Sequence, residues 1–79
     1  MNAKPLKLKN CPFHLEIMKN EYDEWLIIES KTLKVLVNGI DREDAIYQMN
    51  VILSKPELVD RILTEINQSQ QLELFGSIQ

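Results

Sequence analysis

The chain has 79 residues, of which 44% are hydrophobic and 27% charged, with a net charge of -3 at neutral pH. These values are typical of one small globular domain, and a content of only two glycines and three prolines argues against a disordered or low-complexity chain. The single cysteine, Cys11, excludes an internal disulfide and a thiolate metal cage, and it favours a reducing, cytoplasmic setting. No apolar run approaches the roughly 20 residues that cross a bilayer, and the first residues lack the apolar core of a signal peptide, so we expect no membrane contact.

Charge is unevenly distributed along the chain. Lys4, Lys7 and Lys9 make residues 1–11 a basic arm, which would contact nucleic acid if any segment does, and which is otherwise a solvated tail. Residues 41–79 have three basic and seven acidic residues, a balance of -4 that repels phosphate. The acidic residues are Asp41, Glu43, Asp44, Glu57, Asp60, Glu65 and Glu73.

Residues 12–38 predict a three-stranded antiparallel meander. FHLEIM alternates, which places Phe13, Leu15 and Ile17 on one face of a strand. WLIIES continues this face with Trp25 and Ile27, and KTLKVLVNG supplies a third run rich in branched residues. A helix over residues 13–22 is the competing interpretation, because Leu15, Met18, Tyr22 and Trp25 also have helical spacing. We favour the hairpin, since Asn20 and Asp23 favour a turn.

Two amphipathic helices are predicted after the sheet. Asn38-Gly39 can adopt positive φ and end the third strand, and Asp41 is a natural N-cap for a helix over residues 41–53. The tetrapeptide SKPE predicts a capping box that opens a second helix over residues 55–68. The sequence thus predicts one α+β domain in which both helices cover one face of the sheet. The expected core is Leu15, Ile17, Trp25, Ile27, Val35, Val37, Ala45, Ile46, Met49, Ile52, Leu58, Ile62, Leu63 and Ile66.

The tail, residues 69–79, becomes apolar again after a glutamine-rich spacer. Its apolar residues are expected either to pack on the domain or to bind another protein as a short helix or strand. These candidate partner-binding residues are Leu72, Leu74, Phe75 and Ile78.

The sequence has no catalytic constellation, and we expect no enzyme activity, no cofactor and no metal. His14 is the only histidine, and its pairing with Cys11 would need an unusual geometry near Pro12. The acidic residues at the start of the first helix lack the spacing of a calcium loop and are explained by helix electrostatics. Tyr22 and Trp25 could stack on a base, but we interpret Trp25 as a core residue.

The segments EYDEWLIIES, LKVLVNG and IDREDAIYQMNVIL together resemble the HicB-type antitoxin domain. The resemblance covers residues 13–53, and the family usually has threonine at the capping position that Asp41 occupies. Two features of the family are absent: SKTLK replaces the proline-glycine segment before the third strand, and the helix at residues 55–67 has no basic face for DNA. The matching positions are Trp25, Gly39, Asp41, Glu43, Asp44 and Ala45.

Residues 26–66 also resemble the Phd/YefM-type antitoxins, through LIIESKTLKVLV and SKPELVDRILTEI. The amino-terminal DNA-binding helix of that family has no counterpart in MNAKPLKLKN. Both resemblances imply a protein that binds and neutralises a small basic toxin. A small adaptor or regulatory subunit of unrelated ancestry is the alternative. We also expect a homodimer, formed through a sheet edge or the second helix, because a small sheet with open edges benefits from burying more surface.

Overall fold

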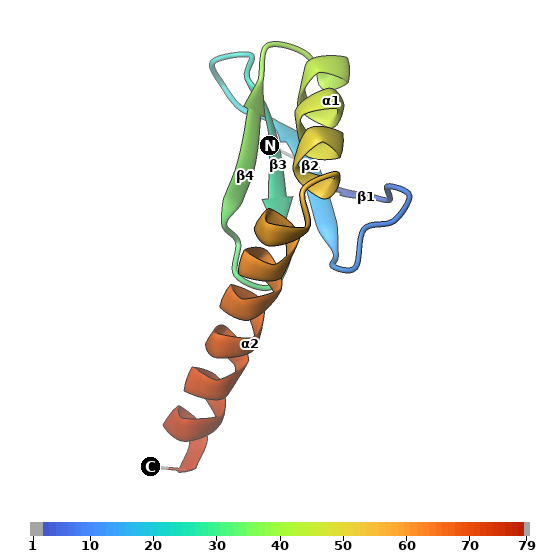
Figure 1. Cartoon of the computed structure of the whole chain (residues 1–79). Helices are drawn as coiled ribbons and strands as arrows, with labels where there is room; N and C mark the ends of the chain where they lie inside the picture. The colour runs from blue at the N-terminus through green and yellow to red at the C-terminus, as the bar shows by residue number, and fades with distance from the viewer. Residues whose placement is uncertain (1–2, 79) are drawn as a thin grey trace.

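The computed structural model describes the backbone of residues 3–78 and the side chains of residues 3–69. Four antiparallel strands lie in the order β1-β2-β3-β4, and two helices follow them, so the fold is α+β as predicted (Figure 1). The elements are β1 (Lys4–Leu6), β2 (Leu15–Lys19), β3 (Trp25–Glu29), β4 (Val35–Gly39), α1 (Arg42–Leu53) and α2 (Pro56–Ile78).

The prediction of three strands was wrong by one, because part of the basic arm forms the edge strand β1. Lys4 pairs with Ile17 and Leu6 pairs with Leu15, which buries Leu6 on the helix side of the sheet. A three-residue strand is too short to show alternation in the sequence, and Pro5 has no N–H to donate to a second neighbour. Pro5 is tolerated here because β1 has a neighbour on one side only.

The β2–β3 hairpin is confirmed, and a helix over residues 13–22 is excluded. The side chain of Asn20 accepts hydrogen bonds of 2.9 Å from the backbone N–H groups of Tyr22 and Glu24. Asp23 has a φ of 63°, a left-handed conformation that Asp tolerates better than most residues. These two residues therefore form the turn that the sequence indicated.

The β3–β4 pairing contains a bulge that explains why Val35 is not in the core. Ile27 pairs with Val37, but Ile28 pairs with Val35, so Leu36 is the extra residue on β4. Because side chains alternate along a strand, one extra residue moves Val35 to the face opposite Val37. Val35 is 48% exposed, whereas Val37 is buried. The prediction that Val35 lies in the core was therefore wrong.

Gly39 has a different role from the one predicted. It ends β4 with no positive φ, so it does not form a left-handed turn. A Cβ at this position would lie 2.6 Å from the backbone nitrogen of Ala45. Glycine is needed here because the first turns of α1 lie directly against the end of β4.

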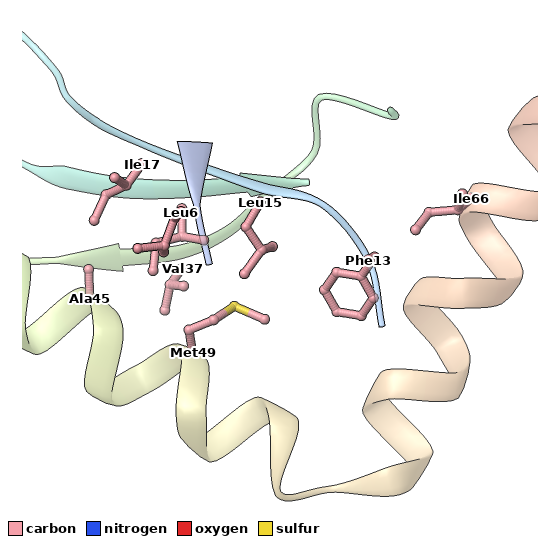
Figure 2. Packing of buried hydrophobic residues seen from close by; sticks show 9 residues of the cluster. Leu6, Phe13, Leu15, Ile17, Val37, Ala45, Met49 and Ile66 are labelled. Atoms are coloured by element: carbon pink, nitrogen blue, oxygen red, sulfur yellow. The ribbon is translucent and has the colours of Figure 1, made fainter. Parts of the chain in front are cut away.

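The start of α1 is capped as predicted. The side chain of Asp41 accepts a 2.7 Å hydrogen bond from the Asp44 N–H, and Asp44 in turn accepts one of 3.0 Å from the N–H of Ile40. Ala45 and Met49 are fully buried against the sheet. Figure 2 shows the Met49 side chain extending between α1 and the sheet toward Phe13.

The beginning and the end of α2 both differ from prediction. Ser54 ends α1 instead of capping α2, and its hydroxyl donates to the carbonyl of Val51 at 2.6 Å. The capping box is therefore wrong, although Pro56 is the first residue of α2. The helix continues to Ile78 instead of ending near residue 68, so the backbone of residues 69–78 is helical. Among the side chains of α2 that the structure describes, Ile66 is the buried one, and beyond it the helix projects past the sheet (Figure 1).

Most of the predicted core is confirmed. Seven of its residues are buried, and five more pack partly buried against them. Leu6 and Phe13 complete the apolar core, and Figure 2 shows Phe13 lying between the sheet and Ile66 of α2. Leu58 is half-buried. Within the described residues, neither helix combines the length and apolar character needed to cross a membrane.

Candidate functional site

The four candidate partner-binding residues, Leu72, Leu74, Phe75 and Ile78, have side chains outside the described residues. Their backbone belongs to α2. The structure therefore places this segment on a helix that extends away from the sheet (Figure 1).

The three lysines of the basic arm do not line a common cavity. Lys4 lies in β1 and lines a cavity of about 350 Å³, whereas Lys7 follows β1 and lines a separate cavity of about 780 Å³. Lys9 is exposed in the turn that follows and lines neither cavity. The positive charges of the arm are therefore not gathered at one cavity.

The larger cavity contains the two residues considered for nucleophilic chemistry. Cys11 and His14 both line it, but the thiol of Cys11 donates to the carbonyl of Phe13 at 3.2 Å. Burial raises the pKa of Cys11, and the hydrogen bond to Phe13 only partly offsets this effect. The thiol is therefore protonated at neutral pH and is a poor nucleophile.

The acidic residues at the start of α1 are used by the helix itself. Asp41 and Asp44 accept the capping hydrogen bonds described above, and Asp44 also accepts a bond of 2.9 Å from the side chain of Gln48. Within residues 3–69, no group of three or more His, Cys, Asp and Glu side chains is arranged to hold a metal ion.

Glu29 is a buried carboxylate that sequence analysis did not select. It lies on the helix side of β3 with 1% of its surface exposed. Its two oxygens accept hydrogen bonds from the N–H of Lys31 at 2.9 Å, and from the N–H and hydroxyl of Thr32 at 2.7 and 2.8 Å. Burial raises the pKa of Glu29, but these hydrogen bonds and the charge of Lys31 outweigh it and bring the pKa below its usual value. Through these hydrogen bonds, Glu29 therefore stabilises the conformation of the β3–β4 loop.

The smaller cavity brings together residues that the sequence keeps far apart. Lys19 ends β2 and pairs directly with Trp25, which begins β3 and pairs with Gly39. Arg42, the first residue of α1, lies three residues after Gly39. Lys4 pairs with Ile17, two residues before Lys19, so the two lysines lie on the same face of the sheet.

Three cations and one indole therefore line the same cavity, which is built from the ends of four elements. Lys4 and Trp25 were considered separately in the sequence, whereas Lys19 and Arg42 were missed. Tyr22, the other aromatic considered for base stacking, is 75% exposed in the β2–β3 turn and does not line this cavity. Only the strand register could have identified the cluster.

No protein-family model, no curated protein and no solved structure matches this chain.

Proposed function

We propose that the chain is a non-catalytic, antitoxin-like module that binds and neutralises a partner protein through the carboxyl-terminal part of α2. The observation that supports this most directly is the length of α2. Among the described side chains of α2, Ile66 is the last one buried in the core cluster, while the helix continues to Ile78, about 18 Å farther at the rise of an α-helix. A helix that extends beyond its own domain is available to lie in the groove of another protein.

The chemistry of the sequence in this segment supports an apolar contact with a partner. Residues 72–78 contain three aliphatic residues and one aromatic residue, the types of side chain that anchor helices in grooves. The acidic balance of residues 41–79 would favour a basic partner by electrostatic complementarity. A small basic toxin would provide such a positively charged partner. The single thiol of Cys11 is consistent with a cytoplasmic location.

The test is capture of the partner by the tagged full-length chain in its native cell. We expect a small basic protein that is lost when residues 71–79 are removed and when Phe75 is changed to Glu. Gln68→Glu is the matched control, because it adds the same charge to an exposed position of α2 within the described residues. Loss of the partner in the control, or its retention after truncation, would contradict the proposal.

Neutralisation is a separate property and needs its own measurement. Expression of the captured partner alone should stop growth, and co-expression of this chain should restore it. A partner that is harmless alone would instead favour an adaptor or regulatory subunit.

We also propose that the chain forms a homodimer through β4. β4 lies at the edge of the sheet, and such an edge can pair with a second copy. Large apolar side chains are exposed near this strand, including Val35 and Ile40, which is 84% exposed. Sedimentation equilibrium should give twice the chain mass of 9.2 kDa, and Val35→Lys should give the monomer. A monomer at every concentration up to tens of micromolar would contradict the proposal.

A further inference from the structure

The cavity of about 350 Å³ at the start of α1 carries a positive charge that contrasts with the rest of the molecule. Lys4, Lys19 and Arg42 line it together with Trp25, and no acidic side chain does. The whole chain has a net charge of -3, so this cluster has the opposite sign to the molecule. Three like charges that the fold holds around one cavity favour an anion there.

The ion pairs within the described side chains do little to neutralise the cluster. Lys19 lies 3.4 Å from Asp23, but both side chains are at least half exposed, and such pairs are weak in water. Neither Lys4 nor Arg42 forms an ion pair among the side chains of residues 3–69. Of the acids beside Arg42, Asp41 and Asp44 are used in capping α1, and Glu43 is exposed without lining the cavity.

The apolar and aromatic residues that line the cavity indicate which second group the ligand carries besides the anion. Trp25 is partly buried against the core and lines the cavity beside Ile17, Met18 and Pro5. An indole offers a flat surface on which a planar ring can stack. The cavity volume is at the small end of the range found for small-molecule sites.

We propose that this cavity binds a small phosphorylated ligand with a planar ring, such as a nucleoside phosphate. Lys4, Lys19 and Arg42 hold the phosphate, and Trp25 contacts the ring. Arg42 is the first residue of α1, so the positive end of the helix dipole adds to the same field. This activity is separate from the partner binding proposed for α2.

The experiment uses the full chain and its own fluorescence, because Trp25 is the only tryptophan. ADP is the probe, and adenosine and inorganic pyrophosphate separate the contributions of ring and phosphate. We expect saturable quenching by ADP, weaker binding of pyrophosphate measured by calorimetry, and no binding of adenosine alone. Added salt should weaken the binding of ADP.

Lys4→Gln and Arg42→Gln should each weaken ADP binding about tenfold, the effect of losing one charge-assisted hydrogen bond. Both side chains are exposed at the ends of their elements, so the variants should unfold at the wild-type temperature. Lys9→Gln is the matched control and should bind ADP as the wild type does, because Lys9 does not line the cavity.

Three results would overturn the proposal. The first is the absence of ADP binding, and the second is ADP binding that is equal in the Lys4, Arg42 and Lys9 variants. The third is tighter binding of a single-stranded DNA 10-mer that weakens equally in Lys4→Gln, Lys7→Gln and Lys9→Gln. That result would assign the charge to the basic arm as a nucleic-acid surface.

Discussion

Replacing Gly39 with alanine tests how closely α1 lies against β4. The added Cβ would lie 2.6 Å from the nitrogen of Ala45, 2.8 Å from its Cα and 3.0 Å from its Cβ. The first two atoms belong to the helix backbone, so no side-chain rotation relieves the contact. Gly39 has no positive φ, so this steric contact is the reason to expect that alanine is unfavourable here.

The size of the effect follows from two opposing contributions. Alanine at a compatible φ stabilises a protein by about 0.4–1 kcal/mol, because it restricts the unfolded chain. Overpacking against a rigid neighbour costs about 1–3 kcal/mol, and a clash with backbone belongs at the upper end of that range. We expect a net loss of about 2 kcal/mol, which lowers the melting temperature of a domain of this size by roughly 8–16 °C.

Urea unfolding followed by circular dichroism measures this loss directly. The double variant Gly39→Ala/Ala45→Gly is informative, since it removes only the 3.0 Å contact and leaves the two backbone contacts in place. We expect it to be no more stable than Gly39→Ala. Asn38→Ala, on the exposed neighbouring position, is the control and should lose less than about 1 kcal/mol. If Gly39→Ala were as stable as the wild type, the close approach of α1 to β4 would be refuted.

Three further predictions concern loops and caps. Glu29→Gln should lose about 1–3 kcal/mol at pH 7, since an amide cannot accept every bond that the carboxylate accepts. Because the folded pKa of Glu29 is lowered from 4.5, this carboxylate should contribute its full stabilisation above that pH and lose it as the pH drops through the folded pKa. Urea titrations from pH 7 to 3 should therefore show a smaller decrease in unfolding free energy for Glu29→Gln than for the wild type. Leu33 has a φ of 60° and is 69% exposed, so Leu33→Asn should raise the unfolding free energy by about 0.5 kcal/mol, and a loss would indicate an unrecognised packing role. In thermal unfolding, Asp41→Ala should lower the unfolding free energy by about 1 kcal/mol and Ser54→Ala by less than about 0.5 kcal/mol. Equal losses would indicate that Ser54 caps α2 after all.

The sequence predicted the elements whose signals are local. Asp41 caps α1 because its side chain bonds an N–H three residues ahead, and this geometry depends on almost nothing else in the fold. The β2–β3 turn is similar, since Asn20 and Asp23 provide the hydrogen bonds and the backbone conformation within five residues.

The errors arose where two elements meet. The face of Val35 depends on the bulge at Leu36, which is a property of the pairing between β3 and β4 and not of either strand alone. The role of Gly39 likewise depends on the position of α1, which no turn rule includes. SKPE fits the capping-box pattern, but α1 ends at this point and its last turn uses the hydroxyl of Ser54.

The candidate cavity was also missed because it forms where several elements meet. Lys4, Lys19, Trp25 and Arg42 are distributed over 39 residues of the sequence with no common spacing. They meet because Lys19 pairs with Trp25, and because Lys4 enters the sheet two residues from Lys19. A prediction of this site required β1, the strand that the sequence did not reveal.

The start of α1 and the projecting part of α2 lie at opposite ends of the molecule (Figure 1), and Arg42 at the start of α1 lines the cavity. Arg42 begins α1 at one end, and Ile78 ends α2 at the other, so a ligand in the cavity cannot block a partner on α2 by direct contact. Coupling between the two would need a conformational change in α1, which contacts both β4 and α2. Met49 is fully buried in the middle of α1 and resists such a change. We therefore expect the chain to capture the same amount of partner with and without saturating ADP, measured in parallel for the wild type and Arg42→Gln. A several-fold difference in the wild type that disappears in Arg42→Gln would show that α1 transmits ligand binding to the partner-binding helix.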